Sequence, residues 1–247
     1  MSSRQHPQAR GGKGEPVWAR PEPGSRRPRY SREQIAAAAL AIADAEGIEA
    51  VSMRRLATEL GAGTMTLYHY VETKHDLLTL MNDAVMGELL VPEAELAAGW
   101  REALIQLAGR SRAAMLRHPW ALALPHDLIG PNSLRHIEQS LAAVADLPVG
   151  MAEKIELISL VDDYALGFVM RDDLQDDLRE GWIPSVADYI RTQLHTGEFP
   201  HIEALLGGDD PETALRRLIA DATADDRFHR GLTRLLDGVA LHLERSR

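Results

Sequence analysis

The fold of this chain is decided by residues 51–71, which read VSMRRLATELGAGTMTLYHYV. The hydroxyl of Ser52 can cap a short helix that we expect over Met53–Leu60. Two glycines follow it and break the helix, since glycine readily adopts the backbone conformations that end one. A second short helix is predicted over Thr64–Val71. Two short helices around a tight, glycine-containing turn predict a helix-turn-helix unit.

A further helix precedes this unit. Ser31 stands three residues before Gln34, the spacing of a capping box, in which each side chain bonds the backbone N–H of the other residue. The alanine-rich run that follows is predicted to be helical as far as Gly47, which can supply the C-cap. Residues 31–78 therefore read as one domain of three helices, the last two forming the helix-turn-helix.

The side chains that point outward from Thr64–Val71 indicate what the unit binds. Leu67 and Val71 are four residues apart and face inward, while the outward positions carry hydroxyls, a methionine and aromatic rings with hydrogen-bonding groups, and no acidic residue. Such a surface suits DNA, because hydroxyls reach phosphates or base edges, a methionine contacts the thymine methyl group, and an arginine at the preceding helix can bond guanine. The candidate DNA-binding residues are Arg54, Thr64, Met65, Thr66, Tyr68, His69 and Lys74.

Residues 1–30 differ from the rest in composition and charge. They hold seven Lys or Arg against two Glu, and 12 of the 30 are Gly, Pro or Ser. We expect a disordered basic tail with few side chains in a core. Two interpretations stay open: a flexible, solubilising extension, or a basic arm that follows DNA phosphates or a minor groove. The second is favoured for Arg26, Arg27 and Arg29.

The whole chain of 247 residues has a net charge of −10, is 45% hydrophobic and contains no cysteine. The absence of cysteine excludes a disulfide framework, a zinc finger of the cysteine type, an iron–sulfur site and a cysteine nucleophile. No HExxH, Walker, Rossmann or Gly-x-Ser-x-Gly pattern is present, so we expect no enzyme activity, no cofactor and no metal. Apolar runs are too short to span a membrane and no secretory or lipidation signal is visible, which predicts a cytoplasmic protein that does not bind membranes.

Residues 79–247 show helical patterns throughout and no competing strand pattern, so the predicted fold class is all-α. We interpret this part as a ligand-binding and dimerisation domain. One segment, 155–170, is too apolar on all sides for a surface helix, so both of its faces must be covered. The expected helices are Leu77–Leu90, Leu96–His118, Pro131–Asp146, Met151–Arg179 and Phe228–Leu243, with two shorter helical patterns around a loop at 207–211.

Residues 31–78 resemble the DNA-binding domain of the TetR family of bacterial regulators. The resemblance lies in Gly47, the run 51–61, the run 66–71, Lys74 and Leu77-Leu78. It implies that Thr64–Val71 is the recognition helix. Residues 96–243 resemble, more loosely, the C-terminal domain of the tetracycline repressor, on the residues Trp100-Arg101, Arg117-His118-Pro119-Trp120, Gly130-Pro131-Asn132, Gly167-Phe168 and Phe228…Gly231-Leu232. This implies a homodimer joined by a four-helix bundle, whose recognition helices read a near-palindrome in double-stranded DNA.

A small-molecule pocket is predicted from the acidic pair that interrupts the most apolar helix. An unpaired carboxylate beside apolar surface is costly. Asp162 and Asp163 therefore either pair with an arginine or lie at an exposed edge, or they form a polar site for a ligand. In the second interpretation the apolar walls are Met115, His118, Trp120, Phe168 and Met170.

The sequence thus predicts a ligand-responsive DNA-binding regulator, most simply a repressor. Its effector would be a small, hydrophobic or amphipathic molecule that shifts the population to a conformer with misplaced recognition helices. The helix Leu77–Leu90 would couple the two domains. Two alternatives stay open: an enzyme or small-molecule-binding protein that retains a helix-turn-helix, and a ligand-free DNA-binding protein.

Overall fold

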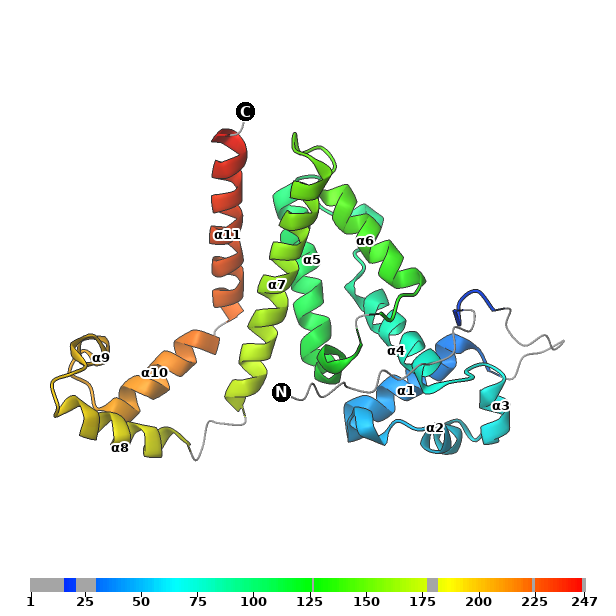
Figure 1. Cartoon of the computed structure of the whole chain (residues 1–247), viewed down its shortest axis with the longest axis horizontal. Helices are drawn as coiled ribbons and strands as arrows, with labels where there is room; N and C mark the ends of the chain where they lie inside the picture. Colours follow the sequence, from blue (N-terminus) through cyan, green and yellow to red (C-terminus); the bar gives the residue numbers. More distant parts are fainter. Residues whose placement is uncertain (1–15, 21–29, 126, 177–181, 224, 246–247) are drawn as a thin grey trace, which may run out of the picture. The chain divides into compact units, whose positions relative to one another are not determined.

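The computed structural model describes residues 16–20, 30–125, 127–176, 182–223 and 225–245 (Figure 1). Within these ranges every regular element is helical and no strand occurs, which confirms the all-α fold class. The α-helices are α1 (Arg32–Glu46), α2 (Met53–Leu60), α3 (Thr64–Tyr68), α4 (Lys74–Leu89), α5 (Trp100–Arg117), α6 (Pro131–Ala143), α7 (Met151–Asp176), α8 (Trp182–Leu194), α9 (Pro200–Leu206), α10 (Pro211–Thr223) and α11 (Asp225–Arg245).

The chain divides into two compact units. The first comprises residues 1–84 and 123–134, and the second comprises 85–122 and 135–247. The division falls inside two helices, because α4 continues past residue 84 and α6 begins before residue 135. Helices α4 and α6 therefore each run from one unit into the other.

Local sequence explains the first unit. Ser31 accepts the backbone N–H of Gln34 and the Gln34 side chain accepts that of Ser31, so the predicted capping box is present. Gly47 follows α1 with φ of 86°, a value that favours glycine. Helix α1 packs against α2, and α2 against α3. The core contains the fully buried side chains of Ile35, Ile42, Leu56, Leu67 and Leu77.

The third helix is shorter than predicted. Helix α3 ends at Tyr68 and not at Val71, although Val71 is buried as expected. The chain tightens after Tyr68: the backbone N–H of His69 donates to the carbonyl of Thr66 and that of Tyr70 to the carbonyl of Leu67. Such bonds across three residues close the last turn of an α-helix and end it.

The predicted tail is partly wrong in the stretch that the structure describes. Residues 16–20 form a turn in which Val17 is only 2% exposed. Arg20 forms ion pairs with Glu72 and Asp76. Composition did not indicate this packing, because it depends on two residues only. Val17 is buried, and Arg20 pairs with residues that are far from it in the sequence. Arg26, Arg27 and Arg29 lie outside the described residues.

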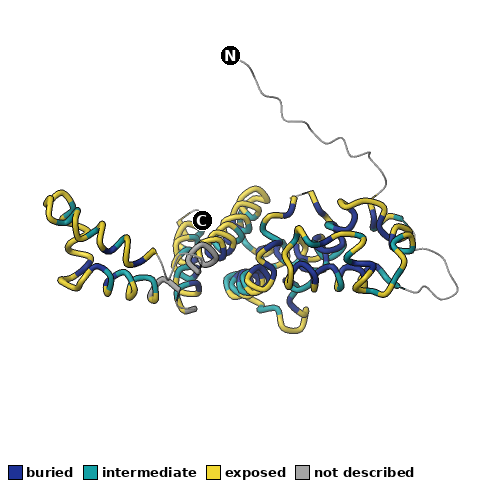
Figure 2. The backbone as a smooth tube through the Cα atoms, turned by 90° about the horizontal axis from the view of Figure 1, so that it is seen from below, coloured by how far each residue is buried: buried dark blue, intermediate teal, exposed yellow. Residues whose placement is uncertain are grey.

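In the second unit α5 packs along α7, and α11 contacts both (Figure 1). Their shared core contains Leu104, Val161, Phe168, Leu232 and Leu236. Helix α8 packs against α10, and Gly207 and Gly208 lie in the predicted loop between α9 and α10. Figure 2 shows the resulting pattern, with buried positions on one side of these helices and exposed positions on the other.

Three helices of this unit start or end differently from the prediction, and one of them, α11, extends past the predicted Phe228–Leu243 at both ends. Helix α5 begins at Trp100 and not at Leu96, because a 3₁₀ turn over Glu93–Glu95 comes first and Gly99 provides the N-cap. Helix α6 ends at Ala143.

Helix α7 is covered on one face only: Met151, Ile155, Leu160, Leu166 and Met170 remain exposed.

Candidate functional site

Helix α3 presents the outward face that its sequence predicts. Met65 is 73% exposed and Tyr68 42%, and His69 at the end of the helix is exposed too. Leu67 is fully buried, and this single buried position fixes the rotation of the short helix. Thr64 and Thr66 are half-buried at its edges. The structure therefore brings these five candidate residues together on one surface.

Helix α2 holds two neighbouring arginines in different environments. The Ser52 hydroxyl accepts the backbone N–H of Arg55 and caps the helix. The guanidinium of Arg55 lies 2.7 Å from Glu46 and 2.8 Å from Glu59, so its charge is matched within the protein. Arg54 is exposed on the adjacent side of the helix. Of the two, Arg54 is the residue whose side chain faces solvent more fully.

The start of α4 contributes the next candidate, Lys74, which is exposed at the first position of the helix. The Thr73 hydroxyl accepts the backbone N–H of Asp76, and the Asp76 carboxylate accepts that of Thr73, which is a second capping box. The sequence carried its signal, a Thr-x-x-Asp spacing, but we did not predict it. The capping box fixes the backbone of residues 73–76 and so the point from which the Lys74 side chain projects.

Electrostatics at this helix start depend on Arg20. Burial alone would raise the pKa of Asp76, but the hydrogen bond and charge of Arg20, with two backbone N–H donors, lower the pKa below its usual value. Arg20 also lies 2.9 Å from Glu72. The carboxylate of Asp76 is thus held ionised beneath the exposed surface.

A second cluster joins α4 to the start of α6. The carboxylate of Asp83, which is buried, accepts the backbone N–H groups of Asn132 at 2.8 Å and Ser133 at 3.2 Å. The Asn132 amide returns a 3.0 Å hydrogen bond to the Asp83 carbonyl oxygen. A carboxylate on unsatisfied N–H groups at a helix N-terminus is favourable. We call Asp83, Gly130, Asn132 and Ser133 the α4–α6 junction.

The residues predicted for a ligand pocket lie in three settings. Met115, His118 and Trp120 are buried near the end of α5, where His118 Nε2 lies 3.2 Å from Glu88 Oε1 and the rings of His118 and Trp120 are in edge contact. Glu88 also forms an ion pair with Arg117. These side chains connect α5 with the last turn of α4.

Phe168 is part of the hydrophobic core and does not line an open pocket. Its ring contacts Phe228 at a centroid distance of 5.2 Å, and the guanidinium groups of Arg112 and Arg227 lie 5.4 and 5.0 Å from its centroid. Met170 is 56% exposed on the same helix. The sequence could not show that Phe228, from α11, fills the space beside Phe168.

The acidic pair of α7 is divided between two environments. Asp163 is exposed, whereas Asp162 is half-buried. Burial, with a smaller contribution from the charge of Asp163, raises the pKa of Asp162 to about 6. The carboxyl group of Asp162 thus titrates close to neutral pH.

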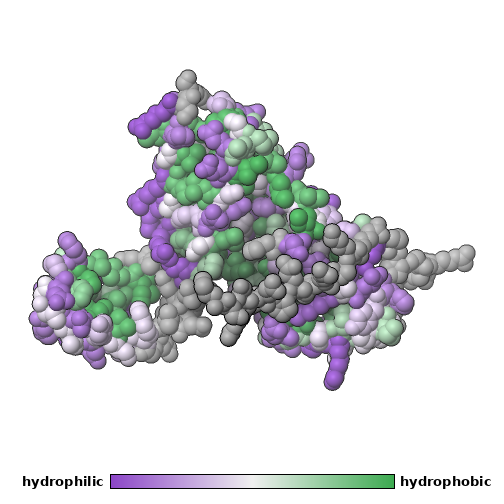
Figure 3. All heavy atoms as spheres, in the orientation of Figure 1, coloured by the Kyte–Doolittle hydropathy of each residue, from purple (hydrophilic) through white to green (hydrophobic). Residues whose placement is uncertain are grey.

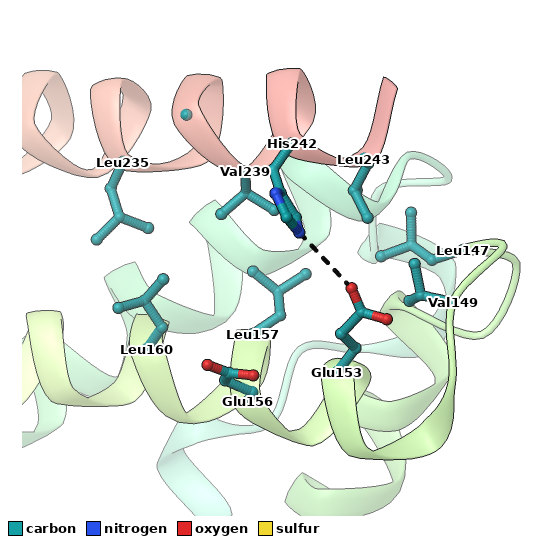
Figure 4. Close-up of a pocket in the computed structure, with 11 residues that line it drawn as sticks. Leu147, Val149, Glu153, Glu156, Leu157, Leu160, Leu235, Val239, His242 and Leu243 are labelled. Carbon is teal, nitrogen blue, oxygen red and sulfur yellow. Dashed lines mark ion pairs between the residues drawn. The ribbon is translucent and has the colours of Figure 1, made fainter. Parts of the chain in front are cut away.

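Two grooves in the described part of the second unit are lined by residues other than those predicted for a ligand pocket. The larger, about 370 Å³, lies between α7 and α11. In Figure 4 the leucine and valine side chains of the two helices point toward each other, and His242 forms a 3.8 Å ion pair with Glu153. The smaller, about 180 Å³, is lined by α8, α9 and the residues between them. The larger groove is lined by Leu147, Val149, Glu153, Glu156, Leu157, Leu160, Leu235, Gly238, Val239, His242 and Leu243.

Sequence reasoning missed one buried polar group of interest. His136, on α6, is buried, and its Nδ1 has no hydrogen-bond partner among the described residues. Burial lowers its pKa, so the ring is neutral at physiological pH. A buried imidazole nitrogen without a partner can accept or donate a bond to a small molecule. No spacing pattern pointed to it, because a lone histidine on a helix has no motif.

The described part of the chain contains no group of three His, Asp or Glu side chains placed to hold a metal ion. None of its helices has the length and apolarity that crossing a bilayer requires.

A helix-turn-helix with an exposed, acid-free recognition helix, joined to a larger helical unit, defines a DNA-binding transcription regulator. Comparison with known proteins gives the family. Residues 35–81 match "Bacterial regulatory proteins, tetR family", and residues 92–243 match "Tetracyclin repressor-like, C-terminal domain". The chain belongs to the TetR family. This family consists of transcription regulators and not of enzymes, in agreement with the sequence-based prediction.

Three similar proteins illustrate the relationship. The transcriptional repressor DrrR1 of Streptomyces coeruleorubidus is 34% identical over 223 residues, which cover 89% of this chain and 80% of that protein. ActR of Streptomyces coelicolor, in complex with actinorhodin, is 26% identical with a TM-score of 0.57, covering 83% of this chain and 97% of that one. BioQ with its natural double-stranded DNA operator is 25% identical with a TM-score of 0.50, covering 62% of this chain and 93% of that one.

Proposed function

We propose that this protein is a homodimeric repressor that binds a near-palindromic operator and releases it when a small molecule binds the second unit. The observation that carries the proposal is the surface formed by α2, α3 and the start of α4. There Arg54, Met65, Tyr68, His69 and Lys74 are exposed, while the acidic neighbours Glu59, Glu72 and Asp76 each pair with an arginine of the protein.

DNA contacts follow from this surface. Arg54 would bond a base or phosphate, and Lys74 would meet a phosphate. The side chains of α3, which are Thr64, Met65, Thr66, Tyr68 and His69, would enter the major groove. The complex of BioQ with its operator supports DNA binding by a chain of this fold.

The dimer would form through α7 and α11. Apolar side chains on the outer face of α7, including Ile155 and Met170, are more than half exposed in the single chain, and α11 adds Leu241. Figure 3 shows hydrophobic residues gathered on the face where Figure 1 places α7. A second copy would bury this surface, which meets the requirement that α7 be covered on both faces.

The effector would bind the second unit. The complex of ActR with actinorhodin supports a small molecule as the ligand type. Binding would favour a conformer whose recognition helices do not fit the operator, so DNA affinity would fall by the ratio of the effector's affinities for the two conformers. Helix α4 is the coupling element, and the α4–α6 junction would pass a movement of α6 to it.

The test measures binding of the purified protein to DNA from around its own gene, at two salt concentrations and with unrelated DNA as competitor. We expect retention of a specific fragment that survives the competitor. Binding that is equal for all fragments would contradict a sequence-reading repressor. Release of the specific fragment then serves as the assay for screening effectors.

A further inference from the structure

The turn at Pro16–Arg20, which we call the N-terminal turn, packs against the first unit although it lies in a stretch of tail-like composition. The backbone N–H of Ala19 donates to the carbonyl of Pro16 at 2.9 Å and closes the turn. Val17 is buried as deeply as core residues of the helices. Burial of this degree shows that the turn is an ordered part of the unit.

Arg20 connects the N-terminal turn to two helices. Its guanidinium lies 2.9 Å from Glu72 and 2.6 Å from Asp76, and its side chain is only 17% exposed. Its carbonyl oxygen accepts a 3.0 Å hydrogen bond from the buried Arg32 of α1. The position of Arg20 is therefore fixed from both its side chain and its backbone.

Trp18 connects the same turn to the start of α6. A Cβ atom on Gly130 would lie 2.6 Å from Trp18 Nε1. The indole therefore lies directly against the backbone of the α4–α6 junction. Across five residues, the N-terminal turn contacts the start of α4 through Arg20 and lies against Gly130, just before α6, through Trp18.

The charge of the DNA-facing end of α4 depends on this contact. Residues 72–76 read ETKHD, so two carboxylates surround Lys74 and leave the stretch with a net charge of −1. Arg20 brings the local sum to zero. Carboxylates beside a phosphate-binding lysine repel DNA, and a buried one without a partner would also disturb the cap of α4.

We propose that the N-terminal turn is a positioning element of the DNA-binding surface: Arg20 neutralises Glu72, holds Asp76 in the cap of α4, and thereby sets operator affinity without touching the operator. This inference rests on the operator binding proposed above. It assigns a role in DNA recognition to a residue outside the helix-turn-helix.

The test compares Arg20→Gln with the wild type in operator binding at about 0.15 M salt. We expect affinity to fall about three- to tenfold, the size of effect that losing one favourable charge near a polyanion produces. Arg110→Gln removes the same charge at an exposed arginine of α5 and is the matched control, with affinity unchanged. Circular dichroism and a thermal melt establish that each variant is folded.

A double-variant comparison separates positioning from direct contact. In a Glu72→Gln background one of the two carboxylates that Arg20 holds is absent, so the part of the effect that passes through this ion pair is already lost. Arg20→Gln should then cost less affinity than it does in the wild type. An equal loss in both backgrounds would mean that Arg20 acts on the DNA directly and not through Glu72, which overturns the proposal. Arg20→Lys keeps the charge and should retain most of the affinity. A loss as large as that of Arg20→Gln would overturn the electrostatic role.

The two proposals fail in different ways. If the wild type binds no DNA specifically, the proposed function fails and this inference with it. If the wild type binds and Tyr68→Ala weakens it, while Arg20→Gln equals the wild type, only the role of the N-terminal turn is overturned.

Discussion

Asp83 on α4 accepts the backbone N–H of Asn132 at the start of α6, at 2.8 Å, and both residues belong to the first unit. Residues 85–89 of α4 and 135–143 of α6 belong to the second unit. The two helices that run from one unit into the other are thus bonded together at one point. Any movement of α6 along its axis must either carry α4 with it or break this bond.

Replacing Asp83 by Asn should uncouple effector binding from DNA release. The amide cannot accept both N–H groups with the strength of a carboxylate, because a charged acceptor forms the stronger bond. We expect effector affinity within about threefold of wild type while the effector-induced loss of operator affinity shrinks about tenfold, a coupling change of about 1.4 kcal/mol. Titration calorimetry and operator binding with and without effector measure the two quantities. Unchanged release would contradict the coupling role.

Arg54→Ala and Tyr68→Ala should each weaken specific operator binding about tenfold or more, since a good base contact is worth about 1–3 kcal/mol. Both side chains are exposed, so the melting temperature should hardly change. Arg110→Ala, an exposed arginine of α5, is the matched control. Normal operator affinity in both variants would show that the recognition surface is assigned wrongly.

Stability should fall as pH rises from about 4 to 6 because of Asp162. Its pKa of about 6 in the folded chain lies above the value of 3.8 for a free aspartate, so the folded state holds the proton longer than the unfolded state does. Its contribution is fully present below about pH 4 and lost above about pH 6. Asp162→Asn should therefore raise the free energy of unfolding at pH 7.5, by about 1–2 kcal/mol after allowing for partial solvent exposure.

Urea titrations of both chains at pH 4.5 and 7.5 check this prediction. The difference between wild type and Asp162→Asn should be larger at pH 7.5. Glu138→Gln, at an exposed carboxylate of α6, is the control. A difference that does not change with pH would mean that Asp162 finds a compensating partner in the assembled protein.

A charge placed on the exposed face of α7 should prevent the chain from dimerising. Ile155→Glu places a carboxylate on a side chain that is 52% exposed in the single chain and that the proposed dimer buries. We expect the variant to sediment as a folded monomer and to lose operator affinity, because two linked recognition helices bind far more tightly than one. Leu205→Glu, at an exposed leucine of α9, is the control and should stay dimeric. A dimeric Ile155→Glu protein would exclude this face.

Much of the first unit could be predicted from local sequence. The Ser31–Gln34 box, the Ser52 cap and the burial of Leu67 depend on residues within one or two turns of each other, so spacing alone reveals them. The same holds for the outward face of α3. Local rules work here because α1 and α2 are capped by side chains directly beside their first turns.

What could not be predicted depends on contacts between distant parts of the chain. Arg20 meets Asp76, and Phe228 occupies the side of Phe168 where we expected a ligand. Neither pairing leaves a periodic signal, since the partner is chosen by the packing of whole helices. The exposed face of α7 is the complementary case: its excess of apolar residues was visible in the sequence, but what covers it was not.

The crowding at Gly130 links three positions that are far apart in the sequence. Any side chain there would collide with Trp18 and with the carboxylate of Asp83, which is already committed to two hydrogen bonds. A substitution at one of the three positions therefore changes which residues the other two tolerate. Among related chains we expect positions 18, 83 and 130 to vary together during evolution, so that a bulkier residue at position 130 accompanies smaller residues at positions 18 and 83.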